Sequence, residues 1–218
     1  MLIERKTLRE QVRTELLNRI RTGAVVPGQS INEVQLAAEL GVSRTPLREA
    51  LIGLETEGQI TSETGRGFQF ARLSVSEIEE LGPIIAELES LALELTPAAR
   101  RLEIGQRLHK EAIEFCTPRA THFQVTTRDE EWHGLLTSAC PNSRLLELLD
   151  QARSGLRRYE SLLIPSEAMI ARNAAEHAAI ASCLIAGDLP GARRALHANW
   201  TNGATRMLAH TSAPYLTE

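Results

Sequence analysis

The chain has 218 residues, and 24 Lys and Arg stand against 28 Asp and Glu, which gives a formal net charge of -4. Aromatic residues make up only 4% and there are three cysteines, so a predominantly β fold and a disulfide scaffold are disfavoured. We expect a mainly helical cytoplasmic protein without a signal peptide or membrane span, because no run of about 18 apolar residues occurs. The acidic balance also speaks against nucleic acid as a partner.

Three amphipathic helices are predicted before residue 58. The run from Thr7 to Glu10 has the form of a capping box, and apolar residues at helical spacing follow it, which predicts a helix over 7–22. Further helix starts at Asn32 and Ser43 predict two shorter helices that end at Gly41 and Gly58.

Two short strands are predicted directly after these helices. Apolar and polar residues alternate over 60–62 and 68–70, and the glycines between them, among them Gly65, supply turn conformations. The first part, residues 1–72, thus has the order of three helices and a hairpin, and its two short helices joined by Gly41-Val42-Ser43 have the sequence form of a helix-turn-helix.

The remaining residues, 73–218, read as helices throughout. A capping box from Ser76 to Glu79 predicts the start of the first helix. Proline or glycine breaks divide the rest, and they fall at Thr96-Pro97, Thr117-Pro118, Cys140-Pro141-Asn142, Ile164-Pro165-Ser166 and Gly187–Gly191. About six helices of 15 to 25 residues are predicted, which form an all-helical bundle.

The helix that begins after Ser43 carries residues suited to DNA. Arg44 and Arg48 are four residues apart and share one face, opposite an apolar stripe. Arginine suits bidentate contact with guanine, and Ser43 and Thr45 suit phosphates or a thymine methyl group. Arg66, which follows Gly65, suits the adjacent minor groove or the backbone. The alternative interpretation is a solvated helix face with incidental arginines.

The segment INEVQLAAELGVSRTPLREALIGLETEGQITSETGRGFQF resembles the winged helix-turn-helix of the GntR-type bacterial transcription regulators, and REQVRTELLNRIRTGAVVPGQSI resembles their first helix and turn. The resemblance covers about residues 7 to 72. It implies that Arg44 and Arg48 read bases, that Ser43 and Thr45 assist, and that Gly65 and Arg66 belong to the wing. It also implies a homodimer on a short palindromic operator in double-stranded DNA, and it disfavours the solvated-face interpretation.

The second part resembles the all-helical effector domain, called FCD, of the FadR-type branch. That resemblance implies a metal held by a D-x-x-x-H pair and two further histidines. Asp129 and His133 match the pair, His177 matches the third position, and Asn199 stands at the fourth, as a weak ligand or one acting through water. We expect a divalent transition metal, Zn²⁺, Ni²⁺ or Mn²⁺, and otherwise no cofactor. The alternative is a hydrogen-bonded polar cluster of Asp129, His133 and His177 without metal.

The effector site is less defined by the sequence. Regulators of this branch that bind carboxylic acids often carry an arginine where this chain has Ile85. The replacement candidates are Arg157, Arg158, Arg172 and Asn173, although each arginine also suits an ordinary surface position. We expect a small organic or sugar acid as the effector.

The leading functional hypothesis is a ligand-responsive DNA-binding regulator, with repression as the commoner behaviour of the family. The alternative is a metal-dependent enzyme with a DNA-binding appendage. Residues 1–72 carry 10 Lys and Arg against 9 Asp and Glu, and residues 73–218 carry 14 against 19, so the acidity belongs to the second part. The net charge therefore does not exclude DNA, and it predicts binding through a few placed arginines.

Overall fold

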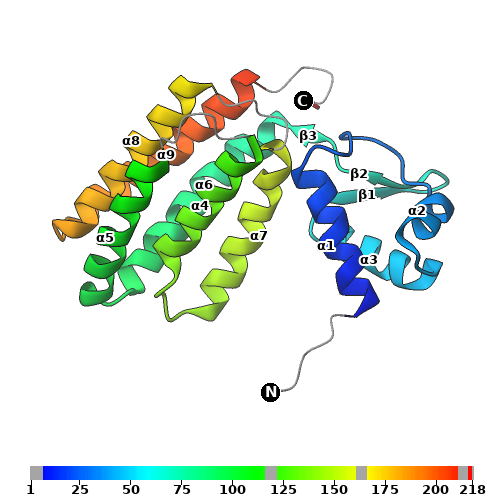
Figure 1. Ribbon diagram of the computed structural model, residues 1–218, viewed down its shortest axis with the longest axis horizontal. Coiled ribbons are helices and arrows are strands. Elements are labelled where there is room, and N and C mark those ends of the chain that lie inside the picture. The colour runs from blue at the N-terminus through cyan, green and yellow to red at the C-terminus, as the bar shows by residue number, and fades with distance from the viewer. Residues whose placement is uncertain (1–6, 116–121, 161–165, 211–215, 218) are drawn as a thin grey trace. The chain divides into compact units, whose positions relative to one another are not determined.

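The computed structural model describes residues 7–115, 122–160, 166–210 and 216–217, and the chain divides into two compact units (Figure 1). The first unit contains Met1–Ser74 together with Ser212–Glu218, and the second contains Val75–Thr211. In the first unit, three short helices surround a small core beside a two-stranded hairpin. The second unit consists of helices alone over its described residues.

The helices of the first unit begin where the sequence predicts. They are α1 (Leu8–Arg21), α2 (Glu33–Leu40) and α3 (Arg44–Thr56). Both bonds of the predicted capping box between Thr7 and Glu10 are present, and the Asn32 side chain accepts from two backbone amides of α2. Ser43 occupies the N-cap of α3, but its side chain makes no capping hydrogen bond. The hydroxyl of Ser43 is therefore not engaged in holding the helix start.

The predicted hairpin is formed by β1 (Ile60–Glu63) and β2 (Gly67–Phe70), which pair antiparallel. Gly65 and Gly67 have φ values of 85° and 75°, a region that favours glycine. The strands contribute one end of a core whose buried members include Val12, Leu16, Ile20, Leu36, Leu47, Leu51, Leu54, Ile60, Phe68 and Phe70. This core fixes the orientation of α3 and of the wing within the unit.

A second pair of strands was not predicted from the sequence. Strand β3 (Leu73–Ser74) pairs in parallel with β4 (Leu216–Thr217). Each strand has only two residues, too few to show an alternating pattern. The pairing places the last described residues of the chain in the first unit, whereas the sequence analysis assigned all of 73–218 to the second.

Six helices make up the described part of the second unit. They are α4 (Val75–Leu95), α5 (Ala98–Phe115), α6 (His122–Thr137), α7 (Ser143–Glu160), α8 (Glu167–Ile185) and α9 (Leu189–His210). The predicted breaks at Thr117-Pro118 and Ile164-Pro165 lie outside the described residues. The predicted cap at Ser76 is wrong, because the chain passes from Ser74 of β3 directly into a helix that starts at Val75.

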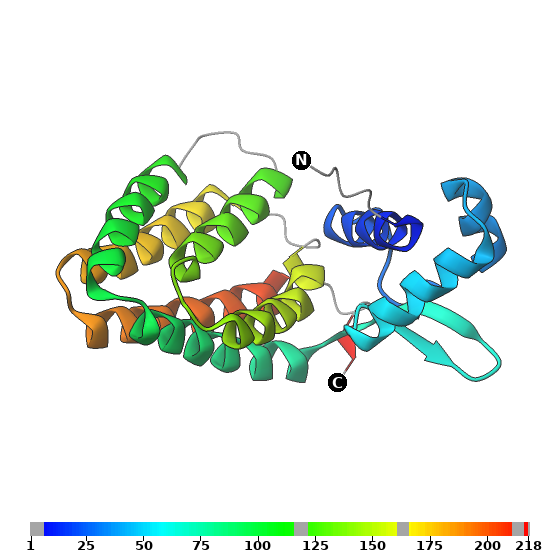
Figure 2. The ribbon, with the colours of Figure 1, turned by 90° about the horizontal axis from the view of Figure 1, so that it is seen from below.

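The six helices lie side by side with their long axes roughly aligned, as Figures 1 and 2 show. Helix α4 packs on α7 and α9, and α8 packs on α5 and α9. A buried cluster between these helices includes Leu93, Ile104, Leu108, Trp132, Leu136, Ile180, Leu184 and Leu196. Among the described residues, none of the helices has the length and apolar character needed to cross a bilayer.

Candidate functional site

The first candidate site is the exposed face of α3. Leu47 and Leu51 are fully buried on the side of the core. Arg44, Thr45 and Arg48 are exposed on other sides of the same helix. The first turns of α3 therefore offer two arginines and a hydroxyl side chain to a partner, as a recognition helix in a major groove requires.

Arg48 is held in place by two neighbours that sequence reasoning missed. One of its terminal nitrogens lies 3.7 Å from a carboxylate oxygen of Glu33, at the first position of α2. Its guanidinium also lies over the ring of Phe68 in the wing, 5.8 Å from the centroid. The Arg48 side chain remains 58% exposed. An arginine that is oriented yet accessible loses less conformational entropy when it binds.

The wing places Arg66 at the turn of the hairpin. Its guanidinium pairs with the carboxylate of Glu63 at 2.8 Å, and the side chain is 81% exposed. Gly65 precedes it with a positive φ and open space where a side chain would stand. Arg66 is thus presented at the tip of the hairpin.

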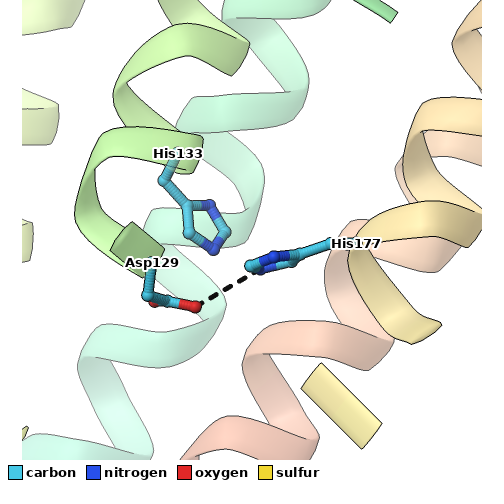
Figure 3. Close-up of side chains that lie close together, drawn as sticks. All are labelled: Asp129, His133 and His177. Carbon is cyan, nitrogen blue, oxygen red and sulfur yellow. Dashed lines mark ion pairs between the residues drawn. The ribbon is translucent and has the colours of Figure 1, made fainter. Parts of the chain in front are cut away.

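The second candidate site is a cluster of three side chains inside the helical unit. Asp129 and His133 lie one turn apart on α6, and His177 approaches them from α8 (Figure 3). One potential ligand atom from each residue lies within 4.8 Å of the other two. His177 Nε2 is 3.4 Å from a carboxylate oxygen of Asp129. The structure therefore brings together the three residues that the sequence assigned to a metal.

His133 is oriented by a residue that the sequence analysis did not select. Its Nδ1 lies 3.0 Å and 3.2 Å from the two carboxylate oxygens of Glu89 on α4. Because a carboxylate accepts hydrogen bonds, Nδ1 carries the proton of this contact, and Nε2 is the ring nitrogen left for a metal. A carboxylate behind a histidine in this arrangement is typical of metal sites in proteins.

His177 is prepared as a neutral ligand by its surroundings. Burial lowers the pKa of its imidazole to about 4, although the Asp129 carboxylate opposes that shift. The ring stacks on the indole of Trp132, with centroids 3.9 Å apart and an angle of 3° between the planes. A neutral imidazole with a fixed orientation suits a divalent transition metal.

A cavity of about 100 Å³ adjoins the cluster. Asp129, His133 and Asn199 line it together with Asn173 and Arg206. Its apolar side chains are Val125, Leu156, Met169, Ile170, Trp200 and Met207. The two imidazoles and the carboxylate of the cluster match the nitrogen and oxygen donors that transition metals take, and the cavity beside Asp129 and His133 leaves room for a further ligand.

Asn199 lies at the fourth position but is engaged with other side chains. Its Nδ2 donates to Glu176 at 3.0 Å and lies 3.4 Å from the oxygen of Asn173. The amide oxygen is therefore the atom left to approach a metal. His197, two residues earlier, lies 3.3 Å from Glu87 and is not among the residues lining the cavity.

The expected effector residues are distributed differently in the structure. Arg157 pairs with Glu130 at 3.1 Å and with Asp150 at 2.7 Å, and Arg172 is exposed. The side chain of Arg158 lies outside the described part of the structure. Asn173 lines the cavity and donates to Asp129 at 2.5 Å.

Arg206 is the arginine that lines the cavity among the described residues, and sequence reasoning missed it. It forms a bidentate pair with Glu176 at 2.9 Å and 3.0 Å and also donates to Asn173 at 3.2 Å. No local motif marks Arg206, because it stands near the end of α9 and reaches the cavity only through the packing of α8 and α9.

The winged helix-turn-helix and the separate all-helical unit together define a regulatory protein of the helix-turn-helix class. More narrowly, the chain belongs to the gntR family of bacterial regulatory proteins, whose model matches residues 8–70, and it carries an FCD domain, whose model matches residues 72–202. Both parts of the predicted family membership are thereby confirmed.

Known proteins of this kind resemble the chain. The HTH-type transcriptional regulator YdhC of Bacillus subtilis is 33% identical over 145 residues, 64% of each chain. The Nta operon transcriptional regulator of Aminobacter aminovorans is 37% identical over 133 residues, 60% of this chain and 63% of that protein. The chain thus matches slightly less than two thirds of the length of these relatives.

A solved structure from Rhodococcus sp. RHA1, described as a GntR transcriptional regulator, shares the fold. Its TM-score is 0.75 at 22% identity, and the match covers 94% of this chain and 99% of that one. The gntR family model and both relatives describe regulatory proteins. The family and the relatives that match the chain are transcription regulators, not enzymes, which favours the regulatory hypothesis over the metal-dependent enzyme.

Proposed function

We propose that the protein binds a specific operator in double-stranded DNA as a homodimer and regulates transcription, most simply as a repressor. The observation that carries this proposal is the exposed face of α3, where Arg44 and Arg48 stand opposite a buried apolar stripe. Ser43 and Thr45 supply hydroxyl groups beside them. Gly65 and Arg66 form the wing tip that reaches an adjacent groove.

A divalent transition metal, Zn²⁺, Ni²⁺ or Mn²⁺, is the proposed cofactor of the helical unit. Asp129, His133 and His177 are its ligands, and Asn199 acts weakly or through water. The neutral His177 and the contact of His133 Nδ1 with Glu89, which leaves Nε2 to a metal, support this assignment over a metal-free polar cluster. When bound, the metal supplies positive charge and open coordination positions beside the cavity.

The charges around the cavity favour a small organic or sugar acid as the effector once a metal is present. Arg206 and Glu176 neutralise each other in a bidentate pair, and His177 is neutral, which leaves the negative charge of Asp129. The net charge beside the cavity is therefore negative and repels an anion, whereas a bound divalent cation would make this net charge positive. Effector binding is therefore expected to require the metal.

The proposed effector contacts are Asn173 and Arg206, which line the cavity. Arg157, Arg158 and Arg172 stay expectations of the sequence alone, because none of them is among the described lining residues. The effector changes operator affinity only by binding the two arrangements of the dimer unequally.

Gel retardation with DNA from the region upstream of the protein's own gene tests the operator proposal. Arg48→Ala is expected to weaken specific retardation by about 5- to 150-fold, because a base-reading arginine contributes about 1–3 kcal/mol. Arg21→Ala is the matched control, since Arg21 lies in the last turn of α1 and outside the proposed face. Equal retardation by wild type and Arg48→Ala would contradict the assignment of α3 as the recognition helix.

A further inference from the structure

The carboxylate of Glu89 joins four helices in the centre of the second unit. Glu89 lies in the interior of α4 and has no exposed surface. It receives Nδ1 of His133 from α6, two nitrogens of Arg153 from α7, at 2.5 Å and 3.2 Å, and the indole Nε1 of Trp200 from α9, at 2.9 Å. Every one of these donors comes from a different helix.

The surroundings keep this carboxylate ionised. Its oxygens accept from the guanidinium of Arg153 and from the indole N–H of Trp200, two groups that can only donate, so these contacts stabilise the ionised form. An ionised carboxylate can only accept hydrogen bonds, so the proton between Glu89 and His133 resides on the imidazole. Nε2 is thereby left as the ring nitrogen available to a metal.

Arg153 adds a second constraint on the same histidine. Its Nη2 donates both to Glu89 and, at 2.9 Å, to the backbone carbonyl oxygen of His133. The ring of His133 is therefore fixed from Glu89, and its backbone is fixed from Arg153. An ion pair between Glu89 and Arg153 alone would require neither the contact of Glu89 with the His133 ring nor that of Arg153 with the His133 carbonyl.

We propose that Glu89 is the positioning residue of the metal site, holding His133 as the tautomer that binds metal through Nε2 and connecting metal binding to α4 and α7. The inference rests on the proposed metal of the preceding section. A metal on Nε2 makes the Nδ1 proton more acidic and strengthens its hydrogen bond to Glu89. A metal held by His133 would thus act on the Glu89 carboxylate of α4, the helix that begins at the residue after β3.

The first test observes the histidine itself in metal-free wild-type protein. Long-range proton–nitrogen NMR spectra distinguish a protonated from an unprotonated imidazole nitrogen. We expect the His133 spectrum to show a protonated Nδ1 and an unprotonated Nε2. A His133 whose Nε2 carries the proton, or whose two tautomers are mixed, would overturn the proposal whether or not any variant folds.

The second test compares Glu89→Gln with Glu87→Gln in titrations with Zn²⁺ and Ni²⁺ followed by calorimetry. Glu87 lies on the same helix but at the surface, where it pairs with Arg193, so its variant is the matched control. Glu89→Gln is expected to weaken metal binding by about 10- to 100-fold and to mix the tautomers of His133. Glu87→Gln should bind as the wild type does.

The outcomes distinguish the positioning role of Glu89 from metal binding itself. Wild type that binds metal while Glu89→Gln binds it within about threefold of wild type overturns the positioning role alone. Wild type that binds neither Zn²⁺ nor Ni²⁺ overturns both the metal and the positioning role. A loss of affinity that Glu87→Gln shares equally also counts against Glu89.

Discussion

The indole of Trp132 lies flat against the imidazole of His177, with ring centroids 3.9 Å apart. Trp200, the other tryptophan of the chain, lies beside His133 with a centroid separation of 4.8 Å. Both tryptophans therefore contact a proposed metal ligand. Their contacts make the intrinsic fluorescence of the protein a reporter of events at the cluster.

Binding of Ni²⁺ is expected to quench the tryptophan fluorescence of the purified protein, because a paramagnetic ion at the cluster lies beside both indoles. A chelator should restore the emission. His133→Ala should lose the quenching, while His197→Ala, which removes a histidine paired with the surface residue Glu87, should retain it. Quenching of equal size in His133→Ala would place the ion elsewhere.

Asn199→His should increase the affinity for Zn²⁺ by about tenfold or more, because an imidazole is a stronger ligand for this metal than an amide oxygen. Calorimetric titration measures the change. Asn202→His is the control, since Asn202 lies on the same helix, is exposed, and also donates to Glu176. An unchanged affinity in Asn199→His would show that position 199 does not face the metal.

The metal-free protein should lose stability as the pH falls from 6.5 to 4. Burial lowers the pKa of His177 from 6.5 to about 4, so in this window the unfolded chain binds more protons than the folded one. The contribution of His177 is complete above pH 6.5, and its loss amounts to about 3 kcal/mol. Urea unfolding at a series of pH values measures it.

The comparison for this titration is His177→Gln, in which the free energy of unfolding should depend less on pH between 6.5 and 4. The groups that face His177, namely Asp129 and His133 of α6, Glu89 of α4 and Glu176 of α8, remain in both proteins. Parallel curves for wild type and variant would contradict the assignment of the effect to His177.

An exposed apolar stripe on α4 is expected to contribute to the homodimer. Ile84, Leu91 and Leu95 are 49%, 42% and 42% exposed, and their spacing of seven and four residues places them on one face. Leu91→Glu should shift the protein toward the monomer in sedimentation analysis. Leu102→Glu, at a similarly exposed leucine of α5, should not, and equal effects of both would reject α4 as the dimer face.

The first unit was predictable because its signals are local. Thr7 and Asn32 cap the helices that follow them through contacts within three residues. The glycines of the wing adopt a positive φ, which glycine tolerates best. The predicted helix start at Ser76 was wrong because α4 already begins at Val75, directly after β3. A strand of only two residues gives no alternating pattern in the sequence, so it could not be predicted. The boundary of that helix is set by pairing with residues more than 140 positions away.

The cluster was partly predictable for the same reason. Asp129 and His133 are four residues apart on one helix, and the spacing alone places them on one face. Glu89, Glu33 and Arg206 could not be selected, because each acquires its role from residues of other elements that only the folded chain brings near. Asn199 was chosen for its position, and whether its oxygen reaches a metal is the subject of the Asn199→His experiment.

Because β3 and β4 both belong to the first unit, the helical unit is an insertion in the sequence between them. The chain leaves the first unit after Ser74 and returns to it from Ser212 onward, so two covalent connections join the units. A fragment that stops near residue 72 would contain the recognition helix but neither strand of this pair. Removal of Leu216 and Thr217 would likewise alter the unit that contains α3 rather than the helical one.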